Sequence, residues 1–191
     1  MTVTKQQLLE ALTTTKAPIE VEMLQSFIEV ESGGKGFDSK TGKILIQFEP
    51  VWYKKKAPYS PSGLWSVNKV DVQSKEWEAF NDAFKSNPEA AMESTSIGLP
   101  QIMGFHWKTL GYSSVGAMWD DFKKGEVQQV SGLIKFILAD PRLLNAMKEK
   151  QFDKIASIYN GSSYKELATK LGRVPYDISL QKAYNKYKGL I

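Results

Sequence analysis

The sequence predicts a mainly α-helical fold with a single small β-hairpin. Two observations support this prediction. First, apolar residues recur at intervals of three and four over most of the 191 residues, which is the spacing of one face of a helix. Second, only one short run, residues 44–48 (ILIQF), is β-like, and the turn-prone residues 38–42 (DSKTG) precede it. We therefore expect a hairpin inserted between helices.

The apolar spacing predicts helices throughout the chain. They cover residues 4–13, 19–31, 76–85, 115–122, 127–138, 143–148, 152–159 and 176–187. Residues 57–63 (APYSPSG) form the clearest loop, but the roughly 50 residues before it are too few for an independent domain. There is no internal repeat and no linker, so residues 1–191 are predicted to form one domain.

Composition excludes several classes of function. The absence of cysteine excludes disulfide bridges, a cysteine nucleophile and thiolate zinc sites. The net charge of +4 is a mild basic excess carried by scattered lysines, so we expect no nucleic-acid partner. His106 is the only histidine, and no phosphate-binding loop or EF-hand spacing is present. We therefore expect no metal and no cofactor, and a structural or cleft-rim role for His106.

The N-terminal residues carry no recognisable export signal. Residues 1–16 lack an apolar core of signal-peptide length. No window of the sequence approaches the roughly 20 apolar residues that a membrane-spanning helix needs. We therefore expect synthesis in the cytoplasm, with export depending on another component.

The helix predicted at 19–31 carries the first candidate catalytic residue. Pro18 suits its first turn, and Gly33-Gly34 ends it. At about 100° per residue, Glu31 falls within the apolar stripe and also at the negative end of the helix dipole. Both effects favour the protonated carboxyl and raise its pKa, as a general acid requires. The alternative is a fraying last turn in which Glu31 points to water or pairs with a lysine.

Glu20 offers a comparison on the same face of the same helix. It lies in the first turn, where the helix dipole stabilises its negative charge. Position along the helix therefore separates the two carboxyl groups. Glu31 suits proton donation, and Glu20 is expected to be a helper at the N-terminal end.

Three segments resemble motifs of one group of enzymes. They are Glu31-Ser32-Gly33-Gly34, residues 96–104 (SIGLPQIMG) and Tyr159-Asn160-Gly161. In order and rough spacing they are similar to motifs of goose-type lysozymes and lytic transglycosylases. More specifically, the chain resembles the N-acetylmuramidase catalytic domain of phage endolysins. Gln47 interrupts the Ile-Leu-Phe-Glu run of that family, and residues 162–175 are longer than its usual connection, so local differences are expected there.

The resemblance implies a lysozyme-like fold, with the small hairpin beside a substrate cleft. It implies cleavage of the β-1,4 bond between N-acetylmuramic acid and N-acetylglucosamine, with peptidoglycan glycan strands as the partner. It also implies a monomer that stays in the host cytoplasm until a holin-like partner allows its release to the periplasm and cell wall. A lytic transglycosylase and a non-catalytic wall-binding or phage structural module are the competing hypotheses.

Glycosidic cleavage needs a second group that stabilises or traps the oxocarbenium-like carbon, or that activates water. Glu49 is the leading candidate because it ends the β-like run at 44–48, and its rivals are Asp38 and Glu93. A separation of roughly 6.5–9.5 Å between the two carboxyl groups would indicate inversion, which we favour, and roughly 5–5.5 Å retention. The alternative for Glu49 is a lysine partner within 54–56, or a cap on a helix that begins at Pro50.

Four further residues are candidates for substrate binding. Ser96 and Gln101 are predicted to bracket a helix start, with Pro100 in its first turn. The resemblance makes both of them cleft residues, although plain N-capping by Ser96 is the alternative. It also places the Tyr159 hydroxyl near the acid and Asn160 in the sugar groove, and the alternative for Tyr159 is a core tyrosine.

Overall fold

The computed structural model describes residues 3–67 and 72–190. The chain forms two compact units. Unit 1 comprises Met1–Gly34 and Val130–Ile191, and unit 2 comprises Lys35–Gln129. The prediction of a mainly helical fold is confirmed. Within the described ranges, none of the helices combines the length and the apolar character that crossing a bilayer requires.

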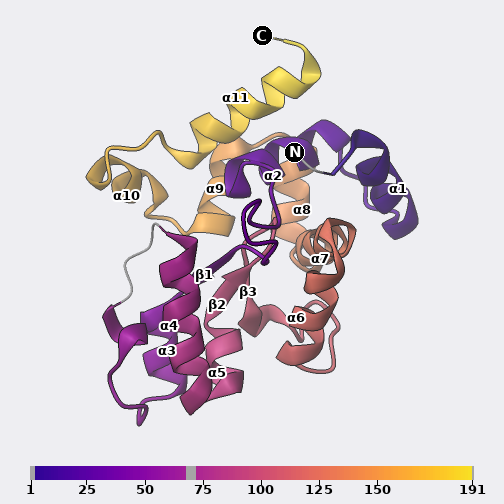
Figure 1. The fold of residues 1–191 in the computed structure, drawn as a ribbon. Helices are drawn as coiled ribbons and strands as arrows, with labels where there is room; N and C mark the ends of the chain where they lie inside the picture. The colour runs from indigo at the N-terminus through magenta and orange to yellow at the C-terminus, as the bar shows by residue number, and fades with distance from the viewer. Residues whose placement is uncertain (1–2, 68–71, 191) are drawn as a thin grey trace. The chain divides into compact units, whose positions relative to one another are not determined.

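Unit 1 is built from helices that lie near the two ends of the sequence. They are α1 (Lys5–Thr15), α2 (Val21–Ser32), α8 (Pro141–Lys148), α9 (Phe152–Asn160), α10 (Tyr164–Lys170), α11 (Tyr176–Lys188) and α7 (Glu126–Ala139) from Val130 onward. The indigo helix α2 packs against the yellow helix α11 (Figure 1). The apolar stripe predicted for α2 is buried as Met23, Leu24, Phe27 and Ile28.

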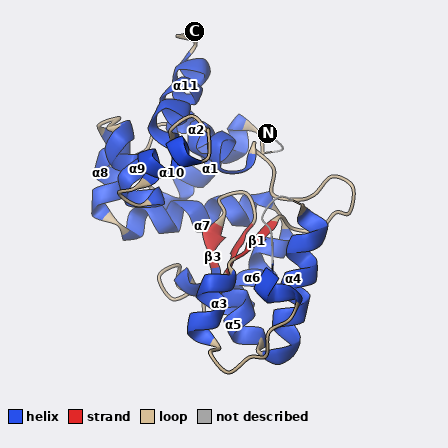
Figure 2. Ribbon diagram, turned by 90° about the vertical axis from the view of Figure 1, so that its left-hand side faces the viewer, coloured by secondary structure: helices blue, strands red, loops and turns tan. Residues whose placement is uncertain are grey.

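Unit 2 contains a three-stranded antiparallel sheet in the order β1-β2-β3, drawn in red in Figure 2. The strands are β1 (Ile46–Phe48), β2 (Thr95–Ile97) and β3 (Ile102–Met103). In the β1–β2 pair, Gln47 lies opposite Ser96. The helices of the unit are α3 (Pro50–Lys56), α4 (Gln73–Ser86), α5 (Pro88–Glu93) and α6 (Val115–Lys124), with 3-10 turns η1 (Leu64–Val67) and η2 (Gly104–His106).

Two local predictions for unit 2 are wrong. The β-like run does not form a self-contained hairpin, because β1 pairs with β2 and only the Phe37–Ile44 bridge closes the turn before it. The segment from Ser96 to Gln101 does not begin a helix but forms β2 and the turn into β3. That turn requires left-handed backbone at Gly98 (φ 71°) and at Gln101 (φ 49°), which excludes a helix start.

The start of helix α2 differs from the prediction, whereas its end agrees with it. Helix α2 begins at Val21 with Glu20 as its N-cap residue, so Pro18 precedes the helix rather than entering its first turn. At the other end, Gly33 has φ 62° and donates its N–H to the Glu29 carbonyl, as the predicted stop requires. Helices α5 and α10, which the sequence analysis did not predict, have six and seven residues, too few to show helical periodicity.

Candidate active site

Glu31 lies in the last turn of α2 and is only partly exposed. Its Oε1 accepts a hydrogen bond from the Tyr176 hydroxyl, at the start of α11. Burial raises the pKa of Glu31 from 4.5 to about 7, and the hydrogen bond from Tyr176 opposes this rise. None of the described lysines pairs with it. Glu31 therefore neither points into open solvent nor pairs with a described lysine.

Aromatic rings form the surroundings of this carboxyl group. The Phe27 ring meets the Tyr159 ring edge-on at 4.6 Å between centroids, and the Tyr176 ring at 6.3 Å. Burial raises the pKa of the Tyr159 hydroxyl, and the charge of Glu31 raises it further. Tyr159 is thus close to the acid, as the resemblance implied. Exposed Asn160 hydrogen-bonds through its side chain to the Tyr176 hydroxyl, which connects it to the same group.

Tyr176 also contacts the Glu31 carboxyl group, but the sequence analysis did not include it among the candidate site residues. The available signal was its position directly after Pro175, at the start of an amphipathic helix. Helix α11 presents two further tyrosine hydroxyls to carboxylates of the α2 segment: Tyr184 donates to Glu20 at 2.7 Å and Tyr187 to Glu29 at 2.5 Å. A carboxylate-rich helix and a tyrosine-rich helix thus face each other, which fixes the position of Tyr176.

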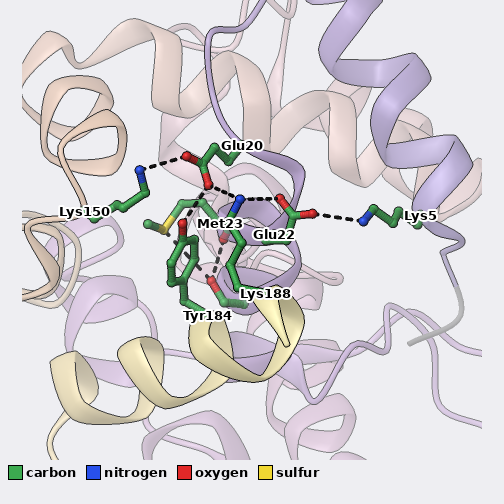
Figure 3. A network of polar contacts seen from close by, with 8 residues as sticks. Lys5, Glu20, Glu22, Met23, Lys150, Tyr184 and Lys188 are labelled. Atoms are coloured by element: carbon green, nitrogen blue, oxygen red, sulfur yellow. Dashed lines mark hydrogen bonds and ion pairs between the residues drawn. The ribbon is translucent and has the colours of Figure 1, made fainter. Parts of the chain in front are cut away.

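Glu20 differs from Glu31 in its chemical state. Its carboxylate pairs with Lys150 and with Lys188, each at 2.8 Å, and Lys188 also reaches Glu22 at 3.5 Å (Figure 3). Hydrogen bonds from Lys150, Lys188 and Tyr184 lower the pKa of Glu20 to about 2. The predicted negative charge is therefore correct, but lysines and not the helix dipole are its main cause. Glu20 anchors α2 and has no proton to donate near neutral pH.

Glu49 is a half-buried carboxyl group of unit 2. It occupies the N-cap position of α3, directly after β1, yet its side chain makes no capping bond. Gln47 instead donates to Glu49 Oε1 at 3.1 Å. Burial raises the pKa of Glu49, the negative charge of Glu76 raises it further, and the Gln47 bond opposes both. Neither capping nor pairing with Lys54, Lys55 or Lys56 is observed for it among the described contacts.

The two rival carboxylates have structural partners. Asp38 Oδ1 accepts from the Thr41 N–H at 2.8 Å and from the Lys40 N–H at 3.0 Å, so it stabilises its own turn. These backbone bonds, that from Thr41 first, lower its pKa. Glu93 is bound by Lys56 at 2.5 Å and by the Trp107 indole N–H at 2.9 Å. Burial acts to raise the pKa of Glu93, but these two partners outweigh it and lower the pKa.

Ser96 and Gln101 are brought together by the β2–β3 turn. Ser96 Oγ donates to Gln101 Oε1 at 3.0 Å, and Gln101 Nε2 donates to the Gly98 carbonyl at 2.7 Å. Ser96 is a buried strand residue, so the N-capping alternative is wrong. Both ends of the Gln101 amide have partners within the turn, which holds its backbone in the left-handed region.

Gln129 is a second residue that the sequence analysis did not select. Its side chain is fully buried, accepts the Leu99 N–H at 2.7 Å and donates to the Phe122 carbonyl at 2.9 Å. A Cβ at Gly98 would lie 2.7 Å from this side chain, and one at Gly36 only 2.2 Å. A glutamine in the apolar stripe of 127–138 was the available signal. It fixes the turn that carries Gln101.

Among residues 3–67 and 72–190, no cluster of three or more histidine, cysteine, aspartate or glutamate side chains is arranged to hold a metal. His106 is half-buried beside the Phe105 ring, at 4.4 Å between centroids. Burial lowers its pKa, so the imidazole is neutral at pH 7. Its environment suits a structural residue.

Comparison with known proteins shows the family of this chain. The model of the N-acetylmuramidase family matches residues 20–188, a range that includes every candidate site residue named above. The chain belongs to the N-acetylmuramidase family. This muramidase is therefore a peptidoglycan-cleaving enzyme, with peptidoglycan as its substrate.

A solved structure supports the same assignment. The muramidase is similar to the crystal structure of Burkholderia AP3 phage endolysin, with a TM-score of 0.79 and 31% sequence identity. The similarity covers 98% of this chain and 71% of the endolysin chain. No curated protein sequence matches it.

Proposed function

We propose that the muramidase hydrolyses the β-1,4 bond between N-acetylmuramic acid and N-acetylglucosamine, as a glycoside hydrolase with Glu31 as general acid. The observation that carries this proposal is a buried carboxyl group whose pKa is raised to about 7. A general acid works best when its pKa lies near the working pH, because it is then both protonated and able to release its proton. Glu20, with a pKa of about 2, cannot take this role.

Glu49 is proposed as the second carboxylate. It is the one of the three candidates that has no cationic partner or turn-stabilising role among the described contacts, since Asp38 holds its own turn and Glu93 is bound by Lys56. The remaining proposed assignments concern substrate contacts. Asn160 is exposed and Tyr159 adjoins the acid, so both suit contacts to the sugar, while Ser96 and Gln101 shape the turn that offers backbone groups.

The products of peptidoglycan digestion test the proposed reaction. We expect muropeptides with free reducing ends, detected by mass spectrometry before and after borohydride reduction. A lytic transglycosylase closes a 1,6-anhydro ring instead of admitting water. Anhydro-muropeptides as the main product would therefore contradict hydrolysis and show that the enzyme is a lytic transglycosylase. NMR of the first-formed anomer then decides between inversion and retention.

Glu49→Gln tests the second carboxylate. We expect hydrolysis of purified peptidoglycan to fall by about 10²- to 10⁴-fold, because the variant keeps the shape of the side chain but loses the charge. Glu93→Gln, which replaces a carboxylate held by Lys56, is the matched control and is expected to retain most activity. Parental activity in Glu49→Gln would exclude Glu49 from the mechanism.

Tyr176→Phe tests the link between the hydroxyl and the acid. The Tyr176 hydrogen bond lowers the pKa of Glu31, so its loss is expected to raise that pKa and move the alkaline limb of the pH–activity profile to higher pH. Tyr187→Phe, whose hydroxyl donates to Glu29, should leave the limb in place. An unmoved alkaline limb in Tyr176→Phe would contradict the assignment of that limb to Glu31.

The biological setting is also a proposal. The solved structure that resembles this muramidase is a phage endolysin, which supports a role in host-cell lysis. We expect a monomer that is held in the host cytoplasm until a holin-like partner opens the route to the wall. Co-expression with and without a holin, followed by culture turbidity, tests this dependence, and lysis without holin would contradict it. Analytical ultracentrifugation tests the monomer.

A further inference from the structure

One edge of strand β1 is completed by side chains rather than by another strand. On the opposite edge, Gln47 pairs with Ser96 of β2. On this edge, the Ile46 N–H donates to Gln73 Oε1 at 3.0 Å, and Gln73 Nε2 donates to the Ile46 carbonyl at 2.7 Å. The Phe48 N–H donates to Glu76 Oε2 at 2.8 Å. Gln73 and Glu76 are three residues apart on α4 and therefore share one face of that helix.

Glu76 differs from Gln73 in that its side chain can carry a negative charge. Glu76 is only 2% exposed, and burying a negative charge costs far more than burying a neutral amide. A glutamine would accept the Phe48 N–H equally well, as Gln73 does for Ile46. Glu49 follows Phe48 directly, and its pKa is raised first by burial and then further by the charge of Glu76. One effect that a carboxylate at position 76 has, and an amide would not have, therefore falls on Glu49.

We propose that Glu76 is a positioning residue that acts through Glu49: its bond to Phe48 fixes the end of β1, and its negative charge acts on the neighbouring carboxyl group. This inference rests on the proposed role of Glu49 as the second carboxylate. With Glu76 ionised, Glu49 keeps its proton to a higher pH, and it retains that proton less readily when the neighbouring charge is removed.

Several other charged groups on the surrounding elements have partners of their own. Strand β2 (Thr95–Ile97) contributes no titratable side chain. On α3, Lys54 binds the Pro58 carbonyl, Lys55 lies over the Trp52 ring and Lys56 binds Glu93. On α4, Lys75 binds Glu78. Among the described residues, Glu76 is thus the charged group that acts on Glu49.

Glu76→Gln separates the charge from the contact. The amide oxygen still accepts the Phe48 N–H, so the sheet is expected to remain intact. We expect the pKa of Glu49, followed by ¹³C NMR of its side-chain carboxyl and assigned with Glu49→Gln, to fall relative to the parent enzyme. The acid limb of the kcat/KM profile should move to lower pH with it, while the alkaline limb assigned to Glu31 should stay.

Glu78→Gln is the matched control. It removes one negative charge from the same helix, two residues further on, where Glu78 is exposed and paired with Lys75. Neither the Glu49 titration nor the acid limb should move. Gln73→Ala removes two hydrogen bonds to Ile46 without changing the charge, so it is expected to lower kcat/KM with the acid limb unmoved.

The outcomes distinguish this inference from the proposed function. An unchanged Glu49 titration in Glu76→Gln overturns the inference, whatever happens to activity. A lowered Glu49 pKa with an unmoved acid limb supports the action of Glu76 on Glu49 and contradicts the catalytic role of Glu49. If Glu76→Gln does not fold, Glu49→Gln gives the reciprocal measurement, because coupled sites shift each other. The Glu76 titration should then move to lower pH, and an unmoved titration overturns the inference.

Discussion

Glu31→Gln is expected to reduce cleavage of purified peptidoglycan by about 10²- to 10⁴-fold, the usual contribution of a positioned general acid. The glutamine oxygen can still accept the Tyr176 hydroxyl, so the helix pair α2–α11 should remain assembled. The measurement is the initial rate of turbidity loss of a peptidoglycan suspension. Glu29→Gln is the matched control, because it makes the same change on the same helix at a carboxylate paired with Lys186.

The same substitution is expected to stabilise the protein above pH 7. Burial raises the pKa of Glu31 from 4.5 to about 7, so between these pH values the folded protein holds a proton that the unfolded chain has released. The free energy of unfolding therefore falls as pH rises from 4.5 to 7, by about 3 kcal/mol in total. Below pH 4.5 this loss is absent.

Glu31→Gln removes this pH dependence. Urea unfolding followed by circular dichroism at pH 5 and pH 8 is the measurement, and the gain in stability from the substitution should appear at pH 8. An inactive variant that shows no such gain would show that activity needs Glu31, but it would contradict the buried, protonated state on which the general-acid role rests. A variant that is active at the parental rate would contradict the mechanism itself.

Gln129→Leu is expected to destabilise unit 2 and to disturb the β2–β3 turn. Leucine has similar volume but leaves the Leu99 N–H and the Phe122 carbonyl buried without the partners that Gln129 provides. Each such group costs about 1–3 kcal/mol. All five tryptophans, at positions 52, 65, 77, 107 and 119, belong to unit 2, so tryptophan fluorescence reports the unfolding of this unit.

The expected result is a lower urea midpoint and lower activity, since Gln101 loses the support of its turn. Gln181→Leu provides the control, because it makes the same substitution at an exposed position of a helix. A Gln129→Leu protein with the parental midpoint would show that the two buried backbone groups find other partners.

The long helices and the acid were predictable from sequence because their signals are local. Apolar residues at 23, 24, 27 and 28 define the buried face of α2, and Glu31 follows on the same face. The charge of Glu20 was predictable as well, but its cause was not. Lys150 and Lys188 come from distant parts of the chain, and no local sequence pattern predicts that they pair with Glu20.

The remaining features depend on contacts between distant residues. Strand β1 finds its partner 49 residues later, at the register of Gln47 and Ser96, and periodicity within one segment cannot specify such a pairing. Gln101 adopts a left-handed conformation that its residue type does not favour. Tyr176 meets Glu31 because α11 packs against α2, a contact that the sequence around either residue does not indicate.

Unit 1 is discontinuous, with the 95 residues of Lys35–Gln129 lying between its two parts in sequence. The hydroxyl that meets the acid is 145 positions away from it along the chain. Closing so long a loop carries a larger entropic cost than forming the mostly nearer contacts of the intervening unit. Proton donation is therefore a property of the completed fold: an unfinished polypeptide contains Glu31, but its carboxyl group then titrates like that of any exposed glutamate.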